Sequence, residues 1–237
     1  MIEISHLTKR HGAKTVVDRV SFTARPGRVT GFLGPNGAGK SSTLRMLLGL
    51  DRPTAGSALI DGAAYASLEH PLRVVGAMLD GAAPVPERRG VDHLRWIARS
   101  NRILPHRIDE VLATVGLAEE ARMRVRKYSL GMKQRLGLAA ALLGEPRVLV
   151  LDEPVNGLDP EGIRTVRTLL RRYAEKGNTV LLSSHLMSET AETVDDVVII
   201  NKGRIIADGT LNEVIGSRDS LEDAFFALTG SAPGMSW

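Results

Sequence analysis

The chain of 237 residues has no cysteine, so it has neither disulfide bonds nor thiolate metal ligands. Aromatic residues are scarce, with four Phe, three Tyr and two Trp, and they do not alternate with basic residues as on surfaces that stack single strands. No apolar run approaches the about 18 residues that a membrane helix needs. The longest candidate, Leu136–Gly144, is short and rich in alanine. We therefore expect a globular protein of ordinary composition, 43% hydrophobic and 24% charged, in a reducing compartment.

The N-terminus also lacks the apolar core of a signal peptide, because residues 1–10 alternate like a strand. The net charge is +4, and much of the basic excess lies in residues 88–107 and 122–133. A basic patch can bind nucleic acid, anionic lipid or a nucleotide. We favour the simpler interpretation of a solvated, arginine-rich helical surface, and we expect no nucleic-acid partner.

The most informative segment present, residues 34–42, reads GPNGAGKSS and has the P-loop pattern G-x-x-x-x-G-K-[ST]. Glycines let the backbone surround a phosphate with N–H groups, and the following helix offers an N-terminus that favours negative charge. We expect Lys40 to reach the β- and γ-phosphates and the Ser41 hydroxyl to bind Mg²⁺. An apolar strand, Val29–Leu33, precedes the loop, and a helical run, Lys40–Leu50, follows it. The predicted nucleotide-binding residues are Gly34, Pro35, Asn36, Gly37, Ala38, Gly39, Lys40, Ser41 and Ser42.

Strand-like and helix-like runs alternate after the P-loop, which predicts an α/β fold with a parallel sheet covered on both faces. Residues 88–145 differ, because they are rich in Arg, Ala and Leu at helical spacing and predict a helical insert. The predicted strands are Ile2–Leu7, Val16–Thr23, Val29–Leu33, residues 57–62, Val148–Leu151, Thr179–Ser183, Val197–Ile200 and Ile205–Ala207. The helices predicted outside the insert, besides the run after the P-loop, are Ile163–Glu175, Leu186–Thr193 and residues 211–229.

Two carboxylates end one of these strands, in the sequence RVLVLDE of residues 147–153. At the carboxyl end of a parallel strand, side chains face the ligand crevice. We expect Asp152 to hold Mg²⁺, often through water, and Glu153 to activate the attacking water as a general base. The alternative is a strand-end turn with solvated acids, and the upstream P-loop favours the catalytic interpretation.

The segment YSLGMKQ, residues 128–134, precedes a helix with Ser129 as a plausible N-cap and Gly131 in its first turn. At this point the chain resembles an ATP-binding cassette (ABC) subunit, because YSLGM is similar to the LSGGQ signature of that family. Leu130 stands where a glycine is usual, and Met132 stands where glutamine is usual. The resemblance implies that Ser129 and Gly131 contact the γ-phosphate of an ATP molecule bound by a second cassette.

The remaining motifs follow in the order of that family. PVNGLD, residues 154–159, resembles the D-loop with Asp159 as its acid, and His185, after a strand, resembles the switch histidine. In the family that histidine donates to a γ-phosphate oxygen or orients the water. The motifs SLGMKQR and LEDAFFALTG are most similar to bacterial multidrug and antibiotic exporters of the bacitracin and daunorubicin resistance types.

Two positions depart from the family pattern. The family stacks adenine on an aromatic residue where this chain has His11, and imidazole offers less stacking area than tyrosine. The family also has a glutamine, between the P-loop and the signature, that links Mg²⁺ to the membrane subunit. The matching residue here is Asp80, a carboxylate that can bind Mg²⁺ but cannot also donate as an amide does.

The resemblance implies a P-loop ABC cassette with a RecA-like parallel-sheet core, an antiparallel β flank and a helical subdomain. We expect a single domain over residues 1–237, with a core at about 1–84 and 146–215, a helical subdomain at about 85–145 and a helical tail at about 211–237. As implied by the family, two cassettes sandwich two ATP molecules as a homodimer or heterodimer. They power export through a separate integral membrane permease from the cytoplasmic face of the membrane.

Two other functions agree less well with the sequence. A mechanochemical ABC ATPase acting on nucleic acid or the ribosome is disfavoured, because such chains carry a coiled-coil insertion or two cassettes. A P-loop kinase would not account for SLGMKQR or for Glu153 as a base.

Overall fold

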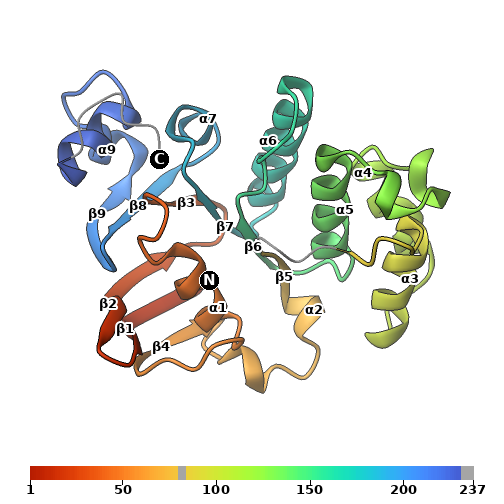
Figure 1. Cartoon of the computed structure of the whole chain (residues 1–237), viewed down its shortest axis with the longest axis horizontal. Helices are drawn as coiled ribbons and strands as arrows, with labels where there is room; N and C mark the ends of the chain where they lie inside the picture. The colour runs from red at the N-terminus through yellow and green to blue at the C-terminus, as the bar shows by residue number, and fades with distance from the viewer. Residues whose placement is uncertain (80–83, 231–237) are drawn as a thin grey trace. The chain divides into compact units, whose positions relative to one another are not determined.

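A computed structural model describes residues 1–79 and 84–230 of the chain (Figure 1). The chain divides into two compact units, one formed by Met1–Leu68 with Leu170–Trp237 and the other by Glu69–Leu169. The boundary at residue 170 falls inside helix α6 (Pro160–Glu175). Each unit has its own strands, helices and buried side chains.

Parallel strands form the centre of the first unit. Strand β3 (Val29–Leu33) pairs in parallel with β7 (Thr179–Ser184) on one side and with β8 (Asp196–Asn201) on the other, and β9 (Arg204–Thr210) runs antiparallel to β8. Every residue of β3 and β7 is buried. Such continuous apolar strands are typical of a parallel sheet covered on both faces, and this part of the sequence prediction is confirmed.

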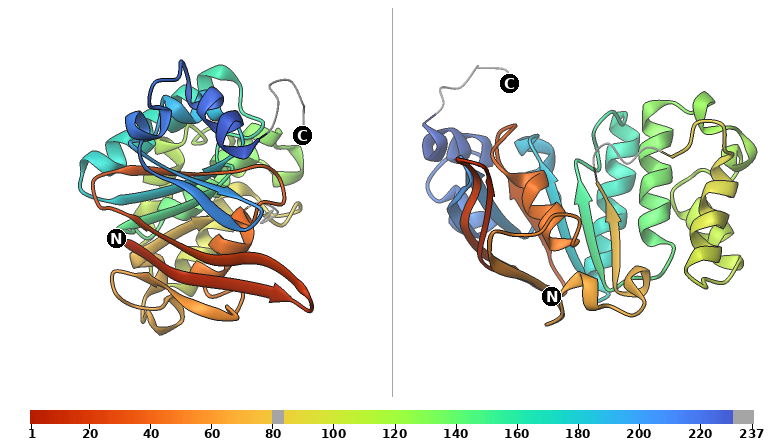
Figure 2. Two further views of the ribbon diagram at one scale, coloured as in Figure 1. Left: turned by 90° about the vertical axis from the view of Figure 1, so that its left-hand side faces the viewer. Right: turned by 60° about the horizontal axis from the view of Figure 1, so that its bottom comes forward.

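A second, antiparallel sheet in the first unit has the order β2-β1-β4. It consists of β1 (Ile2–His11), β2 (Lys14–Ala24) and β4 (Ala55–Ile60), with Ile2 opposite both Ala24 and Ile60. Helix α1 (Lys40–Leu47) contacts all three strands, and Figure 2 shows it beside the long hairpin of β1 and β2. This sheet is the predicted antiparallel flank.

The last helices of the first unit differ from the sequence prediction. A single helix was expected over residues 211–229, but they form two, α8 (Leu211–Ile215) and α9 (Leu221–Thr229). Gly216 ends α8 with a φ of 61°, a backbone conformation that glycine adopts without strain. Ser220 then caps α9 by accepting a hydrogen bond from the N–H of Asp223. Two other helices are shorter than predicted, since α1 ends at Leu47 and α7 spans only Met187–Ala191.

The second unit combines two strands with a group of helices. Strands β5 (Val75–Met78) and β6 (Val148–Asp152) pair in parallel. Helix α5 (Leu130–Leu142) packs against β5, and α3 (Gly90–Ser100) and α4 (His106–Thr114) pack against α5 (Figures 1 and 2). The shorter elements are α2 (Pro71–Val74) and the 3₁₀ turns Tyr65–Ser67, Glu120–Arg122 and Val125–Lys127, of which Tyr65–Ser67 belongs to the first unit.

The helices expected within residues 88–145 are present, and most of the apolar residues at helical spacing in them are buried. Leu94 and Ala98 of α3 are buried, as are Val111 and Leu112 of α4 and Val115 after it.

Within residues 1–79 and 84–230, no helix combines the length and the apolar character needed to cross a membrane.

Candidate functional site

The P-loop connects β3 to α1 in a conformation that only small residues allow. A Cβ atom on Gly34 would lie 2.4 Å from the carbonyl oxygen of Ile200, and one on Gly39 would lie 2.8 Å from that of Val16. Gly39 also has a φ of 113°, which L side chains rarely adopt. The motif glycines Gly34 and Gly39 are therefore required by close backbone packing.

The loop has free donors for an anion. Among the residues that the structure describes, the N–H groups of Asn36, Gly37 and Gly39 make no hydrogen bond. Lys40 is 6% exposed, and its ammonium donates to the carbonyl oxygen of Gly34 at 2.6 Å and of Pro35 at 3.4 Å. Unpaired backbone donors beside an ammonium group at the start of a helix suit a phosphate chain, so these residues fit the phosphates of ATP.

Neighbouring elements of the first unit hold the loop in place. The N–H of Gly203, in the turn between β8 and β9, donates to the carbonyl oxygen of Ala38 at 2.9 Å. Thr43 donates to the Gly39 carbonyl through both its N–H and its hydroxyl, at 3.0 and 2.9 Å. The sequence did not predict that Gly203 holds the P-loop, because the segment shows only a Lys-Gly pair between two predicted strands.

His185 reaches the same sheet edge as the P-loop. Leu33 pairs with Ser184 in the parallel register of β3 and β7, so Gly34 and His185 each follow the last paired residue of adjacent strands. The His185 side chain is exposed. The register thus brings together two motifs that lie about 150 residues apart in the sequence, as expected for the carboxyl ends of parallel strands.

His11 lies at the tip of the β1–β2 hairpin, where it pairs with Lys14 across the turn. Its side chain is exposed, as is Ser41 in the first turn of α1. Further along the hairpin, the carbonyl oxygen of Val16 lies 2.8 Å from the position that a Cβ atom on Gly39 would take. Strand β2, which leads away from His11, is therefore close to the P-loop, and the N–H of Asp18 on it donates to the carbonyl oxygen of Gly203 at 2.8 Å.

In the second unit, the two predicted acids end strand β6. Asp152 is its last residue and is 3% exposed, and Glu153 follows it with a φ of 51°. The amide of Gln134 on α5 donates to the carbonyl oxygen of Glu153 at 3.2 Å. Sequence reasoning placed Gln134 inside the signature but did not foresee this contact.

The signature and D-loop residues cap two helices of the second unit. Ser129 is the N-cap of α5, where its hydroxyl accepts from the N–H of Met132 at 3.1 Å, and Gly131 lies in the first turn. Asp159 precedes α6 and accepts from the N–H of Gly162 at 2.8 Å. The predicted N-cap at Ser129 is confirmed. Asp80 lies outside the described residues.

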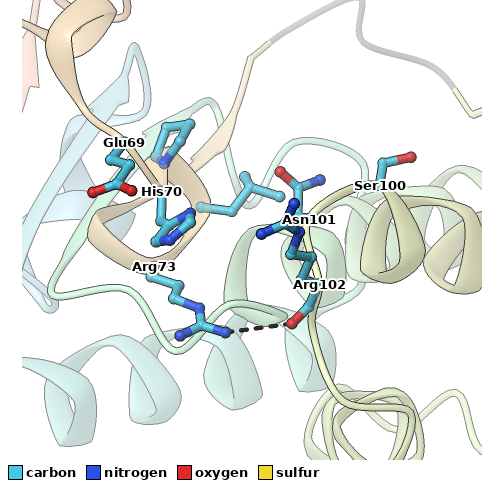
Figure 3. A pocket seen from close by; sticks show the side chains of 8 residues that line it. Glu69, His70, Arg73, Ser100, Asn101 and Arg102 are labelled. Carbon is cyan, nitrogen blue, oxygen red and sulfur yellow. Dashed lines mark hydrogen bonds between the residues drawn. The ribbon is translucent and has the colours of Figure 1, made fainter.

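The second unit also has a depression of about 250 Å³, lined by residues 69–73 and 100–102. Figure 3 shows the Arg73 guanidinium directed at the backbone of Arg102, to whose carbonyl oxygen it donates at 3.3 Å. A cation beside the C-terminus of α3 interacts favourably with the helix dipole. None of the described residues predicted for nucleotide binding or catalysis lines this depression.

Comparisons with known proteins agree with the P-loop fold and its motifs. The model of the family described as "ABC transporter" matches residues 17–156. The bacitracin transport ATP-binding protein BcrA of Bacillus licheniformis is 42% identical over 209 residues, which cover 87% of this chain and 68% of that protein. The lantibiotic transport ATP-binding protein SrtF of Streptococcus pyogenes is 34% identical over 225 residues, 95% of this chain and 96% of that protein. A solved ATP-binding subunit of an ABC transporter superposes with a TM-score of 0.88 at 28% identity, covering 97% of this chain and 99% of the other.

The fold and the loop define a P-loop ATPase with a parallel sheet, an antiparallel flank and a helical region. The chain belongs to the ABC transporter family, as an ATP-binding subunit that hydrolyses ATP.

Proposed function

We propose that this chain powers export through a separate integral membrane permease, as a bacterial antibiotic or multidrug exporter subunit. The observation that carries the proposal is the 42% and 34% identity, over 87% and 95% of the chain, to proteins named for bacitracin and lantibiotic transport. The chain works at the cytoplasmic face of the membrane as a peripheral subunit. It forms one ABC ATP-binding domain over residues 1–237, with the helical subdomain at about 85–145.

The P-loop, residues 34–42, binds the ATP phosphates through its backbone N–H groups and Lys40, and His11 supports the adenine. The hydroxyl of Ser41 and the carboxylate of Asp152 supply oxygen ligands of the kind that Mg²⁺ prefers. Bound there, the metal would neutralise charge on the β- and γ-phosphates. Asp80, where the family has a glutamine, is a further candidate ligand.

Glu153 accepts a proton from the attacking water, and His185 orients that water or donates to a γ-phosphate oxygen. Lys40 stabilises the negative charge of the transferred phosphoryl group. A strand-end carboxylate can act as the base, and this position after β6 supports the role of Glu153.

Two cassettes bind two ATP molecules between them, as a homodimer or with another cassette. Ser129, Gly131 and Asp159 of one cassette contact the ATP held by the P-loop of the other. The N-terminal turn of α5 supports this role, since a capped helix N-terminus with a glycine in its first turn favours an anion.

The permease partner is tested by tagging the full chain in the cells that encode it and purifying it from detergent-solubilised membranes. The proposal expects a copurifying protein with several apolar segments of about 20 residues, whose presence raises ATP turnover. Recovery with ribosomes or nucleic acid, and not with membranes, would instead support the mechanochemical alternative.

A further inference from the structure

Glu153, the proposed general base, has an unfavourable backbone conformation. Its φ of 51° lies in the left-handed region, which is unfavourable for a residue other than glycine. The next residue is Pro154, and a proline ring restricts the residue before it to extended conformations. Something outside this peptide must hold Glu153 in place.

Gln134, on the signature helix α5, contributes to that hold. Its Nε2 donates to the Glu153 carbonyl oxygen at 3.2 Å, and the N–H of Asn156 donates to the same oxygen at 3.2 Å. The first bond reaches across 19 residues of sequence, whereas the second is internal to the turn. Gln134 is the only glutamine in the chain.

The start of α5 packs on the same segment at two more points. A Cβ atom on Gly157 would lie 2.2 Å from the side chain of Leu130, and one on Gly131 would lie 3.2 Å from that of Leu158. Leu130 therefore fills the space that Gly157 leaves open. These contacts fix the distance between α5 and residues 157–158, so the Gln134 amide is presented to Glu153 at a set position.

We propose that Gln134 is a positioning residue that keeps the Glu153 carboxylate where it activates water. The inference rests on the proposed role of Glu153 as the base. Without the amide donor, the carbonyl of Glu153 loses its bond from α5, and the peptide relaxes from the left-handed conformation. The carboxylate then moves, and a displacement of about 1 Å can cost on the order of 100-fold in rate.

Loss of the Gln134 donor should lower ATP turnover without weakening ATP binding. Gln134 does not belong to the P-loop, whose N–H groups and Lys40 carry the affinity for the phosphates. Gln134→Met keeps the length of the side chain but removes the donor, so kcat should fall about tenfold or more while the Kd for ATP stays within about twofold. Gln134→Lys restores a donor and should recover part of the lost turnover.

The experiment measures kcat, the Kd for ATP and the thermal unfolding midpoint of the full chain and its variants. Lys133→Met is the matched control, since Lys133 is adjacent on α5 and its side chain makes no hydrogen bond or ion pair among the described residues. Turnover of Gln134→Met within twofold of wild type would overturn the inference. An equal loss of turnover in Lys133→Met would also overturn it. The same holds if the loss of turnover in Gln134→Met is matched by weaker ATP binding or by a lower unfolding midpoint. Glu153→Gln is assayed in parallel: its normal turnover would remove the proposed base itself, whereas an inactive Glu153→Gln beside a normal Gln134→Met would remove only the positioning role.

Discussion

The side-chain ammonium of Lys40 lies 2.6 Å from the carbonyl oxygen of Gly34, so the lysine of the P-loop folds back onto the first glycine of the motif. The cation is 6% exposed and has carbonyl oxygens as its partners within the loop. A phosphate oxygen that enters the loop offers this ammonium a stronger, charged acceptor.

Replacing Lys40 with alanine should therefore separate ATP binding from folding. Lys40→Ala removes one charge-assisted contact of about 1.5–3 kcal/mol, which corresponds to a loss of roughly 10- to 100-fold in ATP affinity. Turnover should collapse. Isothermal calorimetry with ATP and Mg²⁺ measures the affinity, and unchanged binding would contradict the assignment of the P-loop.

Gly203 should matter to ATP binding although it lies outside every nucleotide motif. It has a φ of 78°, its N–H holds the Ala38 carbonyl, and a Cβ atom there would lie 2.8 Å from the Val16 carbonyl oxygen. Gly203→Ala should lower stability by about 1–2 kcal/mol or more through left-handed strain and this clash, and weaken ATP binding by moving the loop.

Gly177→Ala is the control for that substitution. Gly177 has a φ of 87°, but a Cβ atom there would meet no other atom within 4 Å, so alanine adds strain without a clash. Stability should fall in both variants, whereas the Kd for ATP should rise only in Gly203→Ala. Equal affinities in the two variants would show that Gly203 does not support the loop.

A graded series at His11 tests the adenine platform. His11→Tyr adds stacking area and should tighten ATP binding modestly, and His11→Ala should weaken it by roughly 1–3 kcal/mol, as for one base stacked on an aromatic ring. The measurement is ATP affinity for the three proteins. If all three bind alike, His11 is only a residue of the hairpin tip.

His93 should make the stability of the fold depend on pH. Burial, and then the charge of Arg88, lower the pKa of this histidine on α3, and its Nδ1 is buried without a hydrogen-bond partner among the described residues. Because the unfolded chain titrates near the ordinary value of about 6.5, it takes up the proton first, and stability should fall as pH drops below that value.

The His93→Gln variant should lose that part of the pH dependence. Urea unfolding at about pH 7.5 and 5.5 measures the change for both proteins on either side of the ordinary histidine pKa. The free energy of unfolding of wild type should drop more than that of the variant. A parallel drop in both proteins would assign the effect to other groups.

Much of the fold follows from local patterns in the sequence. The apolar runs at Val29–Leu33 and Thr179–Ser183 predicted buried strands because a parallel sheet leaves no polar face, and the P-loop pattern gave the start of α1 at Lys40. Strand β5 was missed, since its four residues are too few to show a period. The prediction of a single helix over residues 211–229 was wrong. Apolar residues have helical spacing on both sides of Gly216, so the spacing did not reveal that the helix ends there.

The sequence nominated candidate site residues where they belong to contiguous motifs, and their roles stay predictions. It could not predict contacts that reach a backbone carbonyl of a distant segment. The bonds from Gln134 to the Glu153 carbonyl and from Gly203 to the Ala38 carbonyl join segments that are 19 and 165 residues apart. A carbonyl acceptor is common to all residues, so neither bond leaves a signal in the residue types.

The most direct test of the account is ATP turnover by Glu153→Gln beside wild type, measured as phosphate release together with retained nucleotide. The amide has nearly the shape of the carboxylate but is a poor base, and removal of a general base costs about 10²- to 10⁴-fold. The variant should bind ATP as wild type does, hydrolyse it at least about 100-fold more slowly and accumulate as a dimer with intact ATP. Near-normal hydrolysis would contradict the account.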